Sequence, residues 1–280
     1  MASQLGTLYV VATPIGNLDD LSKRAIDTLK QVQRILAEDT RRSQQLLTNF
    51  SIRGSLTSLH DHNERQRVEQ VKAWLAQGDD LALISDAGTP LISDPGYVLV
   101  NQLRQDGFNV VPIPGPCAII TALSVAGLPT DRFCFEGFLP AKPSGRRKVL
   151  QAMSEESRTW VFYESSHRVL ECLKDMNQVL GAERELVLAR ELTKRFETVI
   201  SGTCEAVMAV LSSDSNQCRG EFVIMVKGLP EVTSAPPVSP ELLLQELLPH
   251  VSTKTASQIA AKLTGLPKKE LYQMALGLKP

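Results

Sequence analysis

The chain has 280 residues, which is enough for two compact domains because single hydrophobic cores stop growing at about 250 residues. Thirty Lys and Arg residues against 31 Asp and Glu residues leave a net charge of −1, which gives no support for a free nucleic-acid binder with a large basic surface. The five cysteines show no CxxC spacing, which argues against a disulfide framework and a zinc knuckle. With no signal-peptide pattern and no apolar run near about 18 residues, we expect a cytoplasmic protein without a membrane span.

The first half alternates strand-like apolar runs with helical patterns, which is typical of a mostly parallel sheet with helices on its faces. Runs at 8–12 and 34–37 have the composition of strands. Cap and stop residues bound the helical patterns: Asp19 or Asp20, Gly78, Pro95 and Gly107. The predicted helices are 21–32, 63–77, 95–107 and 116–127.

Three strand-like runs end in loops rich in proline and glycine. Residues 8–12 lead into Thr13-Pro-Ile-Gly-Asn, 81–84 into Ser85-Asp-Ala-Gly-Thr-Pro, and 110–113 into Pro114-Gly-Pro-Cys-Ala. Loops at the carboxyl ends of parallel strands are where open α/β sheets bind ligands. Since the chain has no GxGxxG, P-loop, HExxH or GxSxG motif, these loops predict a ligand site of another kind.

The pattern restarts after residues 138–145, where two prolines, a glycine and a serine predict a domain link. Long β runs separated by few helices then favour a mixed sheet. The predicted strands are 159–163, 185–190, 197–200 and 221–227, with helices near 145–156, 166–179 and 203–212. We therefore expect an α/β fold with an N-terminal domain at 1–137 and a C-terminal domain at 138–230.

A proline-rich segment at 231–240 predicts an extended linker to a helical appendage at 240–280. Helices are predicted at 240–248, 253–264 and 267–276. The last two surround a Gly-Leu-Pro turn and resemble a helix-turn-helix, whose second helix often contacts nucleic acid. A plain helical cap on the second domain is the alternative. In either case the expected buried face consists of Leu263, Leu266, Leu271 and Met274.

Five segments, one of them the loop at 85–90 described above, carry a family resemblance. They are Glu38-Asp-Thr-Arg41, His60-Asp-His-Asn-Glu64, Ser85-Asp-Ala-Gly-Thr-Pro90, Phe135-Glu-Gly-Phe-Leu-Pro140 and Phe162-Tyr-Glu-Ser-Ser-His-Arg168. Together with the three loops, and over roughly residues 7–228, they resemble the tetrapyrrole methylase superfamily. Within it they are similar to the branch of small-subunit ribosomal RNA methyltransferases I.

The resemblance implies two α/β domains that hold S-adenosylmethionine in the cleft between them. It implies methylation of the ribose 2′-oxygen of a decoding-centre cytidine in 16S ribosomal RNA, by a homodimer. Loops of small residues suit this cofactor because the backbone can approach it closely. The residues that the resemblance assigns to the cofactor are Pro14, Ala87, Gly88, Thr89, Ile92, Cys117 and Ala118, and in the second domain Tyr163, Ala189 and Phe222.

Methyl transfer to a hydroxyl requires alignment and removal of a proton, and a positioned base contributes about 10²- to 10⁴-fold. Ionisable residues in loops that face the predicted cleft are the candidates, and they include Glu38 and His167. The five predicted catalytic residues are Asp39, Arg41, His60, Glu64 and Glu164. Asp39 and Glu164 are the favoured proton acceptors or orienters, and a role as a helix cap or ion pair is the alternative for each. His60 and His62 have no third ligand nearby in the sequence, so we expect no metal.

Basic residues occur in places where RNA could bind. Candidate RNA contacts are Lys142, Arg146, Arg147, Lys148, Arg168, Arg190, Lys194, Lys268 and Lys269. A solvated loop and a solvated helix face are the alternatives for 142–148 and for the appendage. Because the net charge is near zero, we expect the substrate to be the assembled subunit rather than free RNA.

Three other functions stay open from the sequence. The same fold could methylate a tetrapyrrole or another non-RNA acceptor. The acidic clusters near residues 38 and 61 would also suit a nucleotide pyrophosphohydrolase that requires a divalent metal. A noncatalytic RNA-binding module is the third, although it would leave the three loops without a purpose.

Overall fold

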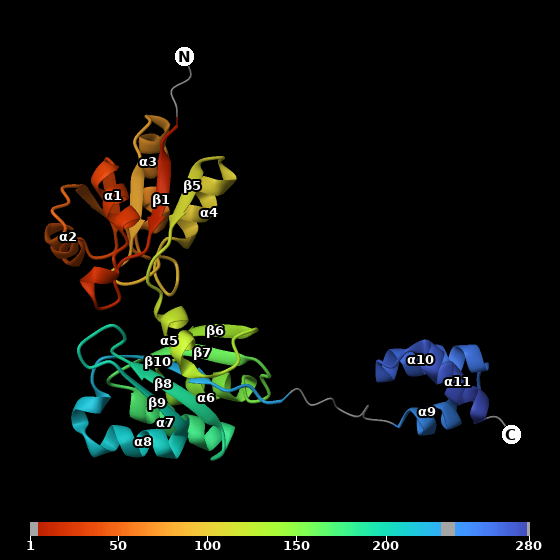
Figure 1. The fold of residues 1–280 in the computed structure, drawn as a ribbon. Coiled ribbons are helices and arrows are strands. Elements are labelled where there is room, and N and C mark those ends of the chain that lie inside the picture. The colour runs from red at the N-terminus through yellow and green to blue at the C-terminus, as the bar shows by residue number, and fades with distance from the viewer. Residues whose placement is uncertain (1–4, 231–238, 279–280) are drawn as a thin grey trace. The chain divides into compact units, whose positions relative to one another are not determined.

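The computed structural model describes residues 5–230 and 239–278 and divides the chain into two compact units, at residues 228 and 229. The larger unit contains two five-stranded sheets, and the smaller unit is helical (Figure 1). Among the described residues, no helix is long and apolar enough to cross a membrane. The predicted linker at 231–238 lies outside the described residues.

The first sheet is parallel throughout, as predicted, with the strand order β3-β2-β4-β1-β5. Its strands are β1 (Thr7–Val11), β2 (Arg34–Ala37), β3 (Ser55–Ser58), β4 (Leu81–Ile84) and β5 (Asn109–Ile113). The edge strand β3 was not predicted, because Ser55-Leu-Thr-Ser has a single apolar residue. The order places β4, β1 and β5 side by side, so their three loops leave the same edge of the sheet.

Helices cover both faces of this sheet because the side chains of a strand alternate between its faces. Ile35 and Ile84 pack with Leu29 of α1 (Lys23–Gln31) and with α2 (Thr40–Asn49). Leu36 and Leu83 face α3 (Glu64–Ala76) and α4 (Tyr97–Gln105). The polar sequence of α2 gave no helical signal, so this helix was not predicted.

Two predicted helix starts were wrong. Ser22, not Asp19 or Asp20, caps α1, since its hydroxyl accepts the amide hydrogen of Ala25; the two aspartates lie in a separate 3₁₀ turn (Leu18–Asp20). Gly96, not Pro95, precedes α4. Gly96 has no side chain to cap the helix, and the carboxylate of Glu64 accepts the amide hydrogen of Leu99 instead.

The second sheet is mixed, as predicted, with the order β6-β7-β10-β8-β9. β6 (Phe133–Phe138) and β7 (Thr159–Ser165) are parallel, whereas β8 (Glu185–Arg190), β9 (Thr198–Thr203) and β10 (Glu221–Val226) form antiparallel pairs. One face buries Trp160 and Phe162. The helices against that face are α6 (Pro143–Ala152), α7 (Val169–Leu180) and α8 (Cys204–Ser213), which a 3₁₀ turn (Ser215–Cys218) follows.

The other face of the second sheet is covered by α5 (Ala118–Ala126), which ends at the left-handed Gly127. The chain therefore passes from the first sheet to the second between Ile113 and α5. The predicted domain limit at 137/138 falls inside β6, and the proline-rich stretch at 138–145 leads into α6. Gly137 has a φ of +64°, and the pairing of β6 with β7 shifts register around it. The side chains of β6 therefore do not alternate regularly between the two faces, and that alternation is the pattern by which a strand is predicted.

The smaller unit contains α9 (Pro240–Leu247), α10 (Thr253–Thr264) and α11 (Lys268–Gly277), close to their predicted ranges. Its core includes Leu271, with Leu266 and Met274 packed against it. Leu263 was predicted to be buried and is instead 63% exposed. Alanines 256, 260 and 275 supply the close helix contacts in its place.

Candidate functional site

The three predicted loops join one another through hydrogen bonds. Thr13 and Gly88 exchange two backbone hydrogen bonds of 2.8 and 3.1 Å, which connects the loops after β1 and β4. The Thr89 hydroxyl donates to the carbonyl of Pro116 at 3.0 Å, which adds the loop after β5. Gly88 has a φ of +84°, a conformation that L-residues rarely adopt. These contacts form one wall of a cleft.

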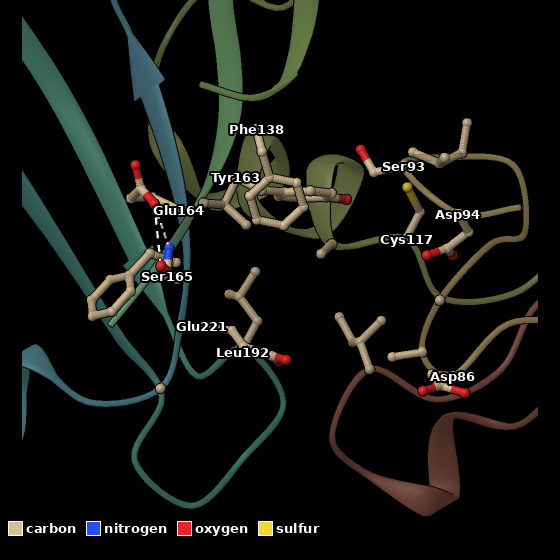
Figure 2. A pocket seen from close by; sticks show the side chains of 18 of the residues that line it. Asp86, Ser93, Asp94, Cys117, Phe138, Tyr163, Glu164, Ser165, Leu192 and Glu221 are labelled. Carbon is tan, nitrogen blue, oxygen red and sulfur yellow. Dashed lines mark hydrogen bonds between the residues drawn. The ribbon is translucent and has the colours of Figure 1, made fainter. Parts of the chain in front are cut away.

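The cleft has a volume of about 520 Å³, within the range of small-molecule sites. Figure 2 shows Asp86, Asp94 and Cys117 on one wall and Tyr163, Glu164 and Leu192 on the opposite wall. The residues that line it are Ile15, Glu38, Arg42, Asp86, Ala87, Gly88, Thr89, Ile92, Ser93, Asp94, Cys117, Ala118, Phe138, Tyr163, Glu164, Ser165, Ser166, Leu192, Lys194, Gly220, Glu221, Phe222 and Val223. Both sheets of the larger unit therefore contribute to the site.

The wall from the second sheet is largely aromatic and aliphatic. The ring of Tyr163 lies 5.0 Å from that of Phe135 and 5.4 Å from that of Phe138, measured between centroids. Burial raises the pKa of the Tyr163 hydroxyl, which keeps it neutral at physiological pH. Leu192 and Phe222 are buried beside it. A flat heteroaromatic group would find a matching surface here.

The opposite wall carries carboxylates. Asp86 is held by Arg42 at 3.0 Å and accepts the amide hydrogen of Asp39, also at 3.0 Å. Burial is the main reason that the pKa of Asp94 rises to about 6, and the charges of Glu38 and Asp86 raise it further. Burial, followed by the charge of Asp86, also raises the pKa of Glu38. This wall therefore favours a positively charged ligand.

Glu164 has a fully buried carboxylate in the wall that the second sheet contributes. It accepts hydrogen bonds from the Ser165 amide at 2.7 Å and from Arg168 at 3.1 Å. Arg168 also donates to the carbonyl of Leu139 at 2.6 Å. Because both oxygens of Glu164 have partners, this network fixes the side chain at the end of β7.

Four of the five predicted catalytic residues lie outside the set that lines the cleft, within the described chain. Asp39 caps α2 and binds Arg41, which lowers the pKa of Asp39 to about 2. The His60 amide bonds to the side chain of Asn63, and Glu64 caps α4. Of the catalytic predictions, the structure brings Glu164 to the cleft.

Eight of the ten predicted cofactor residues line the cleft. Pro14 and Ala189 are buried in the described chain without lining it. The alternation of β8 directs Ala189 into the apolar cluster around Val187 and Met225. Asp86, Ser93 and Asp94 were missed, although they belong to the same motif as Gly88. Leu192 and Glu221 were missed because only the packing of the second sheet brings them to the cleft.

The predicted RNA contacts separate into buried and exposed residues. Arg146 is 2% exposed and pairs with Asp175 at 2.6 Å, and Arg190 is 5% exposed and donates to the carbonyls of Phe196, Asn216 and Arg219. Their burial corrects the prediction that these two arginines contact RNA. Arg168 belongs to the Glu164 network, and Lys194 lines the cleft between Glu191 and Glu221. The exposed candidates are Lys142, Arg147, Lys148, Lys268 and Lys269.

S-adenosylmethionine has an adenine ring, a ribose and a sulfonium beside an ammonium and a carboxylate. The cleft offers an aromatic wall for the ring, an acidic wall for the cations and a loop of small residues around Gly88. These residues fit the cofactor. Among residues 5–230 and 239–278, no group of three His, Cys, Asp or Glu residues could hold a metal ion.

Comparisons with known proteins agree with this geometry. Residues 7–207 match the sequence profile of the Tetrapyrrole (Corrin/Porphyrin) Methylases, and residues 235–279 match that of the RsmI C-terminal HTH domain. The protein named ribosomal RNA small subunit methyltransferase I from Pseudomonas aeruginosa is 53% identical, over 97% of each chain. The chain belongs to this methyltransferase family.

Another family member, from Escherichia coli O157:H7, has the same name and is 50% identical, over 97% of this chain and 95% of its own. The member from Haemophilus influenzae is 49% identical, over 99% of this chain and 98% of its own. The match at the C-terminal end confirms that helices α10 and α11 belong to a helix-turn-helix domain of this family.

Solved structures show the same fold in the larger unit. A cobalt precorrin-4 methyltransferase superposes with a TM-score of 0.60 at 16% identity, covering 79% of this chain and 94% of its own. A uroporphyrin-III C-methyltransferase from Thermus thermophilus superposes with a TM-score of 0.55 at 19% identity, covering 79% and 94%. At these identities the similarity concerns the fold alone.

Proposed function

We propose that the protein transfers the methyl group of S-adenosylmethionine to the ribose 2′-oxygen of cytidine 1402 in 16S ribosomal RNA. The observation that carries the proposal is identity of about one half, over nearly the whole chain, to proteins named ribosomal RNA small subunit methyltransferase I. The cleft supports it because its two walls suit the two ends of the cofactor. The cofactor supplies a methyl group on a positively charged sulfur.

The residues proposed to hold the cofactor are those of the Gly88 loop, with Thr89, Cys117 and Ala118, and the aromatic wall at Tyr163 and Phe222. Glu164 is proposed as an orienting residue, since its network with Arg168 fixes that side of the cleft. Alignment of the acceptor hydroxyl with the methyl–sulfur axis then supplies much of the rate.

The proposed substrate is the assembled small subunit, the proposed oligomer is a homodimer, and the proposed location is the cytoplasm. The near-neutral net charge of the protein supports the assembled subunit as substrate. To bind free RNA tightly, the protein would need a broad basic face. The proposed RNA contacts are the exposed basic residues Lys142, Arg147, Lys148, Lys268 and Lys269.

A comparison of acceptors tests the proposal. The protein is incubated with methyl-labelled S-adenosylmethionine and, in parallel, undermethylated small subunits, a short decoding-centre hairpin or a tetrapyrrole. We expect label in the subunit RNA at a rate well above that in the hairpin. Equal labelling of the hairpin would contradict the assembled-subunit substrate, and label in the tetrapyrrole alone would contradict an RNA substrate.

A further inference from the structure

Two carboxylates in the cleft differ from the others in their partners. Among the described residues, no basic side chain forms an ion pair with Glu38 or Asp94. Asp86, Glu164 and Glu221 are instead paired with Arg42, Arg168 and Lys194. A carboxylate engaged by a cation is a poor proton acceptor, so these two are the groups available for proton transfer.

The position of Asp94 favours it over Glu38. It lies in the loop after β4, six residues after Gly88, which pairs with Thr13. It lines the cleft beside Ser93 and Cys117 (Figure 2). Ser93 has a φ of +64° and Leu91 one of +72°. Two non-glycine residues in this conformation indicate a loop whose strain is maintained by its surroundings, as is common at functional sites.

We propose that Asp94 is the general base that takes the proton from the acceptor hydroxyl. This proposal rests on the proposed function and assigns a residue to it. As the 2′-oxygen forms its bond to the methyl carbon, the carbon–sulfur bond breaks and its electron pair stays on sulfur. The O–H bond breaks at the same time, and the proton moves to the carboxylate of Asp94. The products are the methyl ether, the neutral thioether and a carboxylic acid, so charge and atoms balance.

The surroundings of Asp94 suit this role. Glu38 at the end of β2, Asp61 after β3 and Asp86 after β4 all place negative charge near it and raise its pKa, whereas the neighbouring Ser85 hydroxyl lowers that pKa. On the facing wall Tyr163 is neutral. Burial and these charges raise the pKa of Asp94 to about 6, so the group is ionised at neutral pH and still binds a proton readily.

The kinetic test measures single-turnover methyl transfer to small subunits at saturating cofactor between pH 5 and pH 8.5. Since the base must be ionised, the wild-type rate should fall as the pH drops below about 6. Asp94→Asn, which keeps the shape of the side chain, should lose about 10²- to 10⁴-fold in rate, measured at a cofactor concentration that saturates the variant. Asp27→Asn, on the exposed face of α1, is the matched control and should behave as wild type.

A direct titration provides a readout that does not depend on activity. In the protein with ¹³C-carboxyl aspartate, one NMR signal should titrate near pH 6 and disappear in Asp94→Asn. In Glu38→Gln the same signal, and the acidic limb of the rate profile, should move to lower pH because a neighbouring negative charge is removed.

The outcomes separate the two proposals. If wild type is active and the rate of Asp94→Asn is within about fivefold of the wild-type rate, the role of Asp94 is overturned and the proposed function stays intact. The absence of any aspartate signal that titrates above about pH 5 also overturns that role. A wild type that leaves subunit RNA unlabelled, despite binding the cofactor, overturns the proposed function and the role of Asp94 together.

Discussion

The shape of the cleft depends directly on the backbone conformation of Gly88. A Cβ at this position would lie 3.3 Å from Cγ2 of Ile15, and the φ of +84° strains any L-residue by about 1–2 kcal/mol. We expect Gly88→Ala to weaken cofactor binding by about tenfold or more, because the loop must shift to relieve the contact. Isothermal titration calorimetry with S-adenosylmethionine measures this change.

Gly107 is a matched control for Gly88. Its φ is +78°, but a Cβ there would meet nothing within 4 Å. Gly107→Ala should therefore share the backbone strain and leave the cofactor Kd within about twofold of wild type. Equal losses of affinity in the two variants would show that general destabilisation, rather than the shape of the loop, controls binding.

Arg146 and Arg147 both pair with Asp175, yet burial gives them different roles. The side chain of Arg146 is 3% exposed and that of Arg147 is 44% exposed. Arg146→Ala leaves the Asp175 carboxylate buried with a single, exposed partner, so we expect a loss of about 3–5 kcal/mol in the free energy of unfolding. Arg147→Ala should cost less than about 1 kcal/mol. Urea denaturation of the two variants checks the difference, and similar small losses would contradict a structural role for Arg146.

At the scale of the helix, the start of α1 depends on one hydroxyl. Ser22 accepts the Ala25 amide hydrogen at 3.1 Å, whereas Asp20 lies in the preceding 3₁₀ turn. We expect Ser22→Ala to lower the free energy of unfolding by about 1 kcal/mol. Asp20→Ala, as the control, should change it by less than about 0.5 kcal/mol. A larger loss for Asp20→Ala in thermal unfolding would restore the original cap prediction.

Elements with a strong local signal were predictable from the sequence. Leu81–Ile84 is apolar throughout, and it is a central strand buried on both faces. Edge and polar elements were not predictable: β3 gains its strand conformation from pairing with β2, and α2 has no apolar stripe long enough to recognise. The helix start at α4 depends on Glu64, more than 30 residues earlier, which no local pattern reveals.

The same division applies to the candidate site. The Gly88 loop was predictable because proline and glycine mark it in the sequence. Asp39 was predicted as a proton acceptor or orienter because it stands in an acidic motif after a strand. In the structure Asp39 caps α2 and pairs with the guanidinium of Arg41. Opposite walls of the cleft come from residues as far apart in the sequence as Asp86 and Glu164, and sequence spacing carries no information about which residues face one another.

At the scale of the whole molecule, the cleft and the exposed lysines of α11 lie in different units. Every residue that lines the cleft precedes residue 229, and the helix-turn-helix unit contributes exposed basic residues at the start of α11. We expect the double variant Lys268→Ala/Lys269→Ala to keep the cofactor Kd of wild type. Its affinity for small subunits should fall, with a salt slope lower by about two, since each lost phosphate contact removes about one.

Filter binding at several salt concentrations measures that slope. The control is Lys23→Ala, whose side chain is exposed on α1 in the larger unit. An unchanged slope for the double variant would remove the start of α11 from the RNA interface and leave the cofactor site unaffected.

Methylation of the ribose 2′-oxygen can be measured directly. Undermethylated small subunits are incubated with the protein and methyl-labelled S-adenosylmethionine, the RNA is digested to nucleosides, and the labelled nucleoside is identified by chromatography and mass spectrometry. We predict label in 2′-O-methylcytidine. Label on a nucleobase, or no label in RNA from a protein that binds the cofactor, would contradict ribose 2′-O-methylation by this protein.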